Sequence, residues 1–319
     1  MADRDTDELL RGQLSRRGIL KCMTWAGTGV LWTLSGGMPR SIGLVDEASA
    51  AQLPAGAFTF LQISDSHVGF DKPANPNALG TLQEAIAKIN AMPVQPSFII
   101  HTGDISHLSK DKEFDDADQA IKMTNKKIFF VPGEHDMLDD ENGKAFLQRY
   151  GKETKGAGWY SFEQHGIHFI GLVNVVNLKA GGLGNLGDDQ LEWLEQDVSA
   201  LSSSTPIVVF AHIPLWTVYP EWGWGTEDGA QALSYLTRFG SVTVLNGHIH
   251  QIMQKVEGHV SFHTAMSTAF PQPAPGTAPS PGPMKVPDDQ LRKLLGITTV
   301  NFVQGNKPLA VIDRPLAGA

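Results

Sequence analysis

Five short apolar runs in this sequence, often rich in β-branched residues, are each followed at once by aspartate, glutamate or histidine. Such runs predict buried strands, because a strand covered on both faces need not alternate with polar residues. The polar groups would then emerge where each strand ends, the edge at which open α/β sheets hold their binding sites. In chain order these stretches are Asp65-Ser66-His67, Gly103-Asp104, Gly133-Glu134-His135-Asp136, Ala211-His212 and Gly247-His248-Ile249-His250.

These stretches carry enough carboxylate and imidazole to hold two metal ions. Histidine nitrogen and carboxylate oxygen suit manganese, iron and zinc, and the residue types do not distinguish among these metals. A carboxylate shared by two ions holds them roughly 3.5–4 Å apart, and such a pair clamps a phosphate group and lowers the pKa of a bridging water. We therefore predict a dinuclear metal site that acts on a small phosphate ester.

Cysteine content and charge exclude other kinds of site. The one cysteine, Cys22, lies before the predicted domain, so that domain can hold no zinc–thiolate site, disulfide or cysteine nucleophile. The formal net charge of the 319-residue chain is −9, which argues against nucleic-acid binding. A small anionic substrate is compatible with this charge, because two bound cations would invert the potential inside a pocket. The oligomeric state is left open.

The first fifty residues have the pattern of an export signal. A twin-arginine motif at Arg16 and Arg17 precedes a moderately apolar stretch over residues 22–38 and a small-residue cleavage site, Ala48-Ser49-Ala50. These parts come in the order of a signal peptide. We predict that residues 1–50 engage the twin-arginine export machinery and are cleaved, leaving a periplasmic or extracellular protein. The alternatives are a soluble N-terminal helix and an uncleaved anchor, although the apolar stretch is shorter than the roughly 20 residues of a stable span.

Residues 51–319 are enough for a single domain with a substantial core. Apolar strands and amphipathic helices alternate in its first half, which predicts parallel βαβ units, and a hairpin follows near residue 165. Two stacked sheets with helices outside accommodate this order. Residues 270–283 are too rich in proline for a helix or central strand and should form a surface loop. The expected strands are 58–64, 97–101, 127–131, 159–164, 167–173, 207–210, 242–245, 252–256 and 310–312, and the expected helices are 82–91, 114–123, 188–201, 230–239 and 288–295.

The five motifs, in this order, resemble those of the calcineurin-like metallophosphoesterases. The resemblance covers nearly all of residues 51–319, and it implies an α/β fold: a four-layer αββα sandwich of two mixed β-sheets flanked by helices. The sequence around residues 61–69 and 102–107 is most similar to the class III cyclic-nucleotide phosphodiesterase branch.

The resemblance also implies which residues hold the metals, with Asp104 bridging the two ions. One position departs from the family, because Glu134 stands where an asparagine is usual. We predict that Glu134 coordinates, since an unpaired carboxylate among metal ligands would be costly to bury. If it does not reach the ion, the second metal site is weak. The other implied ligands are Asp65, His67 and His250 for the first ion, and His212 and His248 for the second.

The catalytic residues implied by the resemblance are His135 and Asp136. His135 would contact the substrate phosphate or protonate the leaving group, and Asp136 would orient its ring by a hydrogen bond. The predicted reaction is hydrolysis of phosphodiesters, including cyclic nucleotides, by attack of a metal-bound hydroxide without a covalent phosphoenzyme. Export counts against intracellular cyclic nucleotides as substrates. The alternatives are a phosphomonoesterase that scavenges phosphate and a noncatalytic exported metal-binding protein.

Two further features were open to two interpretations. An aromatic stretch with Trp216, Tyr219, Trp222 and Trp224 could form a pocket wall for a flat leaving group, or its rings could simply pack the loop. His107 follows Asp104 closely enough to line the pocket. The remaining histidines were assigned to structure or surface: His101, His165, His168, His259 and His263.

Overall fold

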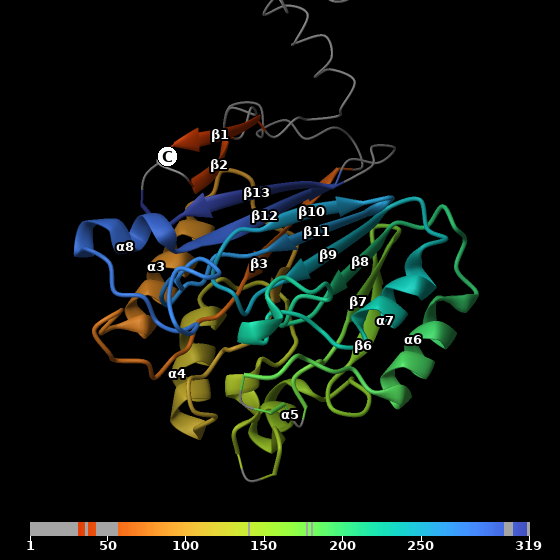
Figure 1. The fold of residues 1–319 in the computed structure, drawn as a ribbon, viewed down its shortest axis with the longest axis horizontal. Coiled ribbons are helices and arrows are strands. Elements are labelled where there is room, and N and C mark those ends of the chain that lie inside the picture. The colour runs from red at the N-terminus through yellow and green to blue at the C-terminus, as the bar shows by residue number, and fades with distance from the viewer. Residues whose placement is uncertain are drawn as a thin grey trace, which may run out of the picture.

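Two β-sheets stack face to face between two layers of helices in the computed structural model (Figure 1). The structure describes residues 57–139, 141–176, 178–179, 181–302 and 309–317, together with the backbone of two paired strands, β1 (Leu31–Ser35) and β2 (Met38–Ile42). The predicted twin-arginine motif and cleavage site lie outside the described residues, so the export signal stays a prediction.

The first sheet has five strands in the order β13-β12-β3-β4-β5. Its centre is a βαβαβ unit in which three strands run parallel, while β12 and β13 are antiparallel additions at one edge. The elements are β3 (Phe58–Ile63), α3 (Ala78–Asn90), β4 (Ile99–His101), α4 (Asp111–Lys122), β5 (Ile128–Phe130), β12 (Gly296–Phe302) and β13 (Ala310–Pro315).

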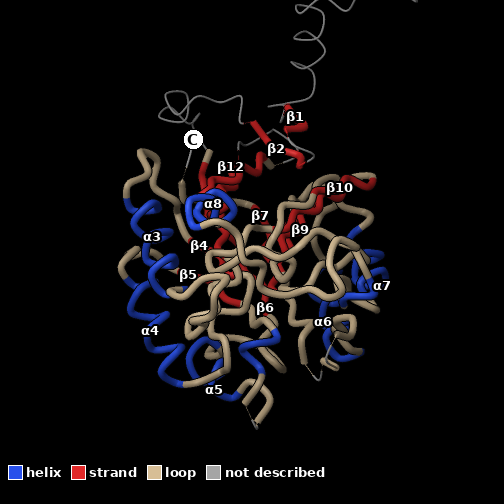
Figure 2. Tube along the Cα trace, turned by 60° about the vertical axis from the view of Figure 1, so that its left-hand side comes forward, coloured by secondary structure: helices blue, strands red, loops and turns tan. Residues whose placement is uncertain are grey.

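The second sheet has six strands in the order β10-β11-β9-β8-β7-β6. Its four inner strands are parallel, and β10 and β6 pair antiparallel at the edges. Helices α6 and α7 cover its outer face, on the side opposite α3 and α4 (Figure 2). The elements are β6 (Tyr160–Gln164), β7 (Ile167–Gly171), α6 (Asp188–Ser199), β8 (Ile207–Phe210), α7 (Gly229–Leu236), β9 (Val242–Asn246), β10 (Gln254–Glu257) and β11 (Val260–Thr264).

The side chains of each inner strand alternate between two cores. On β3, Phe60 points into the layer between the sheets, whereas Leu61 packs under α3 and α4. The inter-sheet layer is largely aromatic: the Phe169 ring lies 5.3 Å from the Phe60 ring, edge to face, and 4.9 Å from the stacked Phe162 ring. Such interdigitation fixes the position of one sheet against the other.

The predicted αββα sandwich is therefore confirmed, and three elements of residues 57–317 are missing from the sequence-based expectation, besides β1 and β2. They are β11, β12 and a short helix, α5 (Lys144–Tyr150). Polar residues interrupt the apolar pattern of β12, yet the strand is buried because their polar groups are satisfied: the Thr298 hydroxyl donates to the Asp313 carboxylate at 2.7 Å. Residues 270–283 contain neither helix nor strand and lead to α8 (Asp288–Leu294).

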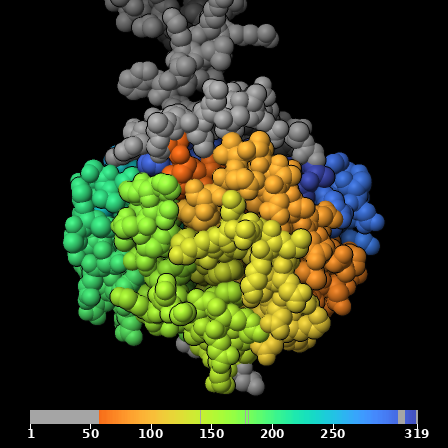
Figure 3. Space-filling model, turned by 180° about the vertical axis from the view of Figure 1, so that it is seen from behind, coloured from red at the N-terminus to blue at the C-terminus, as the bar shows by residue number. Residues whose placement is uncertain are grey.

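Seen from behind, the orange and yellow segments of the first half of the domain lie beside the green segments of the second (Figure 3). Among the residues that the structure describes, no helix combines the length and the apolar character needed to span a membrane.

His168 joins the second sheet to helix α6 through two ion pairs. Its Nδ1 lies 2.6 Å from Glu163 on β6, and its Nε2 lies 2.7 Å from Asp197 on α6. Burial opposes protonation, but the two carboxylates outweigh it and raise the pKa of His168. The ring can therefore donate from both nitrogens while it is protonated.

Removing an inter-sheet ring should destabilise the domain strongly. Phe169→Ala leaves a cavity among fully buried rings, so we expect a loss of about 3–5 kcal/mol in the free energy of unfolding. Urea denaturation measures it. Val256→Ala, at a position that is 74% exposed, is the control and should change stability by less than about 0.5 kcal/mol. Similar effects of the two changes would contradict this account of the core.

The stability contributed by His168 should depend on pH. Because folding raises its pKa above the ordinary 6.5, the contribution is complete below pH 6.5 and disappears as pH rises through the raised value. His168→Gln should therefore destabilise most below pH 6.5 and progressively less in alkali, as measured by denaturation across pH. His259→Gln, in an exposed turn, should not alter this profile. A pH-independent effect of His168→Gln would refute the ion-pair explanation.

Candidate metal centre

The seven predicted metal ligands come together where strands of both sheets end. The first sheet contributes Asp65 and His67 after β3, Asp104 after β4 and Glu134 after β5. The second contributes His212 after β8 and two histidines after β9. All seven belong to groups whose ligand atoms lie within 4.8 Å of one another. Their gathering at the carboxyl ends of the strands agrees with the expectation from sequence, and metal binding itself stays a prediction.

The first group comprises Asp65, His67 and His250, all buried. The Nε2 atom of His250 lies 3.2 Å from Oδ1 of Asp65 and 3.2 Å from Nε2 of His67. The other ring nitrogen of His250 donates to the carbonyl of Phe270 at 2.6 Å. This bond leaves Nε2 directed at the centre, the arrangement common for metal-binding histidines.

The second group comprises Glu134, His212 and His248. The Glu134 carboxylate lies 2.7 Å from Nε2 of His212 and 2.9 Å from Nδ1 of His248. Burial opposes the ionisation of Glu134, but the charges of the two histidines outweigh it and hold the pKa of Glu134 well below its ordinary value. An ionised Glu134 therefore lies where the resemblance predicts an asparagine.

Asp104 lies between the two groups. Its Oδ2 atom is 3.4 Å from Nε2 of His67 and 3.4 Å from Nε2 of His212. Its other oxygen accepts the backbone N–H of His135 at 2.9 Å. One carboxylate oxygen is thus equidistant from a ligand of each proposed ion, as a bridging aspartate requires.

The backbone is strained at the site. Asp65, His67, Asp104, His248 and His250 all have a positive φ, between 40° and 69°. This left-handed region is unfavourable for residues with a Cβ, and such strain clusters where function requires a particular side-chain direction. Neighbouring strands therefore hold these residues in place against their local preference.

Glycines of the motifs allow the strand ends to approach. Gly103 has a φ of +96°, and a Cβ there would lie 2.6 Å from Nδ1 of His212. A Cβ on Gly133 would lie 2.1 Å from the Asp104 carboxylate. Both distances are far below van der Waals contact, so only glycine fits between the ligands.

The donor set fits two first-row metal ions. It contains only carboxylate oxygen and imidazole nitrogen, the ligands that suit manganese, iron and zinc. Nδ1 of His212 is bonded to the carbonyl of Thr102 at 2.7 Å, so its buried Nε2 faces Asp104 and Glu134. A metal ion held by these carboxylates would have this nitrogen as a further ligand.

The structure does not show the predicted hydrogen bond between Asp136 and the His135 ring. In the described part of the chain its carboxylate accepts bonds from the backbone N–H groups of Ile105, Ser106 and Gly133 and from the Ser106 hydroxyl, and none of its bonds reaches the His135 ring. Burial and the Asp104 charge raise the pKa of Asp136 to about 6. Asp136 joins the loop after β5 to the loop after β4, and so acts on the site through the backbone.

His107 takes the role predicted for Asp136. Its carbonyl lies 2.6 Å from Nδ1 of His135, and its ring stacks on the His135 ring with centroids 4.8 Å apart and an angle of 17°. The proximity of His107 to Asp104 in the sequence predicts a position near the site, but a bond made by its backbone carbonyl leaves no trace in the sequence. The proline-rich segment was also missed: Phe270 orients His250, and Gln272 donates to the carbonyl of His248 at 3.0 Å.

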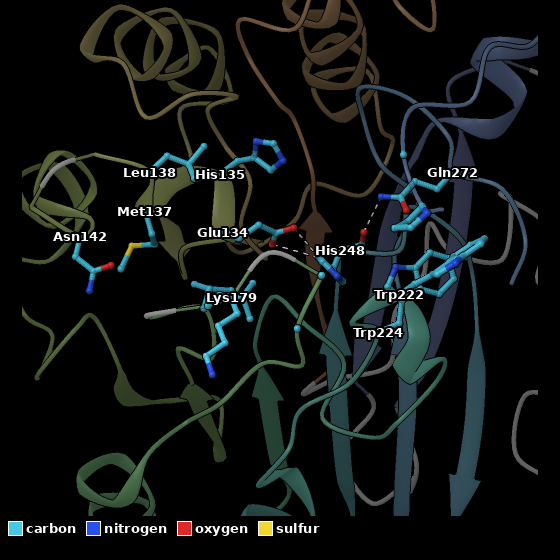
Figure 4. Close-up of a pocket in the computed structure, with 16 residues that line it drawn as sticks. Glu134, His135, Met137, Leu138, Asn142, Lys179, Trp222, Trp224, His248 and Gln272 are labelled. Atoms are coloured by element: carbon cyan, nitrogen blue, oxygen red, sulfur yellow. Dashed lines mark hydrogen bonds and ion pairs between the residues drawn. The ribbon is translucent and has the colours of Figure 1, made fainter. Parts of the chain in front are cut away.

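A pocket of about 410 Å³ adjoins the second group of ligands (Figure 4). Glu134, His135 and His248 lie on its wall, and Gln272 borders it from the proline-rich segment. The two interpretations of the aromatic stretch each hold in part. Trp222 and Trp224 line this pocket but are buried and packed edge to face at 5.1 Å, whereas Trp216 packs against Phe262.

The chain was compared with known proteins, and residues 58–252 match the model of the calcineurin-like phosphoesterase family. A probable glycerophosphodiester phosphodiesterase GpdQ from Arcobacter nitrofigilis is 23% identical over 221 residues, covering 65% of this chain and 77% of that protein. The 3',5'-cyclic adenosine monophosphate phosphodiesterase CpdA from Vibrio vulnificus is 23% identical over 231 residues, covering 70% of this chain and 81% of that protein.

A solved structure has the same fold. The crystal structure of a dimetal phosphatase from Danio rerio superposes with a TM-score of 0.59 at 15% identity, covering 82% of this chain and 96% of that one. Because the family model matches more than half of the 319 residues, the protein belongs to the calcineurin-like phosphoesterase family.

Proposed function

We propose that this protein is a dinuclear-metal-dependent phosphodiesterase. One observation carries the proposal: two groups of ligand atoms share Asp104, whose Oδ2 lies 3.4 Å from an imidazole nitrogen of each group. When bound, two divalent ions there would activate water and neutralise charge on a phosphate group. Membership of a metal-dependent hydrolase family supports the same reaction class.

His135 is the proposed proton donor to the leaving group. It lies on the pocket wall beside Glu134, and its Nδ1 is held by the His107 carbonyl at 2.6 Å. The other ring nitrogen, Nε2, is therefore the atom available to a substrate. Burial opposes its protonation, but the carboxylates of Asp104 and Glu134 raise the pKa of His135. A histidine held in this way on the pocket wall suits general acid catalysis.

The names of the two relatives support a diester as substrate, since both denote phosphodiesterases. The pocket beside the second group offers room for one of the two ester groups. Because a dimetal phosphatase has the same fold, a phosphomonoesterase is the second candidate function. We further propose export through the twin-arginine pathway, which would favour extracytoplasmic diesters over intracellular cyclic nucleotides.

The reaction class can be tested on metal-free protein loaded separately with manganese, iron or zinc. We expect two ions per chain by elemental analysis, and faster hydrolysis of bis(p-nitrophenyl) phosphate than of p-nitrophenyl phosphate. Faster monoester hydrolysis would favour the phosphatase. Two bound ions with no hydrolysis of either ester would favour a noncatalytic metal-binding protein.

Asp104→Asn should abolish the activity by disrupting both ion sites at once. Because one carboxylate oxygen faces both ligand groups, we expect metal content to fall and diester hydrolysis to drop by more than the roughly 100-fold seen when outer partners of metal ligands are lost. Asp189→Asn, at an exposed position of α6, is the control for a lost carboxylate. Full activity with normal metal content in Asp104→Asn would exclude the bridging role.

His107 should matter through its stacking on His135. His107→Ala removes the ring but keeps the backbone carbonyl, so we expect kcat to fall by about 10-fold with unchanged metal content and KM. His107→Phe preserves the stack and should recover most of kcat. Steady-state kinetics and elemental analysis of both variants test this. An equal loss in the two variants would show that the imidazole itself, rather than the stacking, is required.

A further inference from the structure

Glu134 adds a third carboxylate to the metal centre, beside Asp65 and Asp104. Its two oxygens lie 2.7 Å and 2.9 Å from nitrogens of His212 and His248. The side chain is 24% exposed, and it lines the pocket that adjoins the second ligand group. Figure 4 shows Glu134 and His248 joined on the pocket wall. The carboxylate thus faces both the metal position and the space where substrate would lie.

The additional charge changes what the centre attracts. Each ligand carboxylate cancels one of the four positive charges that two divalent ions bring. A neutral amide at position 134 would leave a net surplus of two positive charges, whereas Glu134 leaves one. Phosphate diesters carry one negative charge, but monoesters and inorganic phosphate carry about two at neutral pH. A dianion therefore loses about twice as much electrostatic attraction to Glu134 as a monoanion does.

We propose that Glu134 makes this site select monoanionic phosphodiesters against dianionic monoesters and inorganic phosphate. The inference rests on the proposed function and names the residue that determines which phosphate esters the enzyme prefers. It also implies weak inhibition by phosphate, so that the enzyme would turn over diesters where inorganic phosphate is abundant. Two other groups of the pocket wall, the proposed proton donor His135 and the exposed Lys179, also attract anions. Both are present whichever residue stands at position 134, so they do not alter the comparison between Glu134 and a neutral side chain.

A charge series at position 134 tests the proposal. Glu134→Gln and Glu134→Asn remove the charge at two side-chain lengths, and Glu134→Asp keeps it on a shorter side chain. With two ions bound, both neutral variants should bind inorganic phosphate more tightly by titration calorimetry. They should also shift the ratio of kcat/KM for bis(p-nitrophenyl) phosphate to that for p-nitrophenyl phosphate toward the monoester, on the order of 10-fold. Glu134→Asp should resemble the unchanged protein in both measurements.

The controls separate this inference from the proposed function. Glu221→Gln removes an exposed carboxylate next to Trp222 and should change neither quantity. If the unchanged protein hydrolyses diesters but the neutral variants keep its substrate ratio and phosphate affinity, the inference is wrong and the function stands. If no ester is hydrolysed, the proposed function is wrong. The affinity of the variants for inorganic phosphate then still tests whether Glu134 disfavours dianions. Neutral variants that hold only one ion at saturating metal would assign Glu134 to metal retention and overturn the proposal.

Discussion

The structure depends on holding several negative charges close together in a buried space. Asp65 and Asp104 are almost inaccessible to solvent, and Glu134 lies beside them. Neighbouring imidazoles offset the repulsion between these carboxylates. Although burial opposes its ionisation, the imidazoles and Ser64 lower the pKa of Asp65 to about 2. Such an arrangement is unstable unless the groups cannot move apart. The strained φ angles and the close approach of Gly133 to Asp104 are the means by which the backbone keeps them together.

The two sheets have to be rigid because each supplies part of the centre. Asp104 comes from the first sheet, whereas His212 comes from the second, and their contact distance of 3.4 Å crosses the interface between the sheets. The aromatic layer around Phe60 and Phe169 maintains this interface. A shift of one sheet along the other would separate the two ligands. The packing between the two sheets therefore also determines the geometry of the site.

The sequence was sufficient for the layers, the strand order of the first half and the set of residues at the centre, because strand ends and motif residues are local patterns. It was insufficient where a contact is made by the backbone of a distant segment. The identity of residue 107 does not predict that its backbone carbonyl is bonded to the His135 ring. Phe270 lies in a segment whose sequence predicts only a loop. Strand β12 was missed because its threonines are polar, although Asp313 on the neighbouring strand β13 accepts a hydrogen bond from Thr298.

The substitution of glutamate for asparagine alters the centre without altering the fold. Glu134 begins a short 3-10 turn (Glu134–Met137) that Asp136 anchors through backbone N–H groups, so the turn does not depend on the side chain at position 134. The longer carboxylate reaches both imidazoles of the second group. The consequence of the substitution is therefore confined to the charge seen by a ligand in the pocket. On the proposal above, a single residue in the loop after β5 determines which phosphate esters the centre accepts.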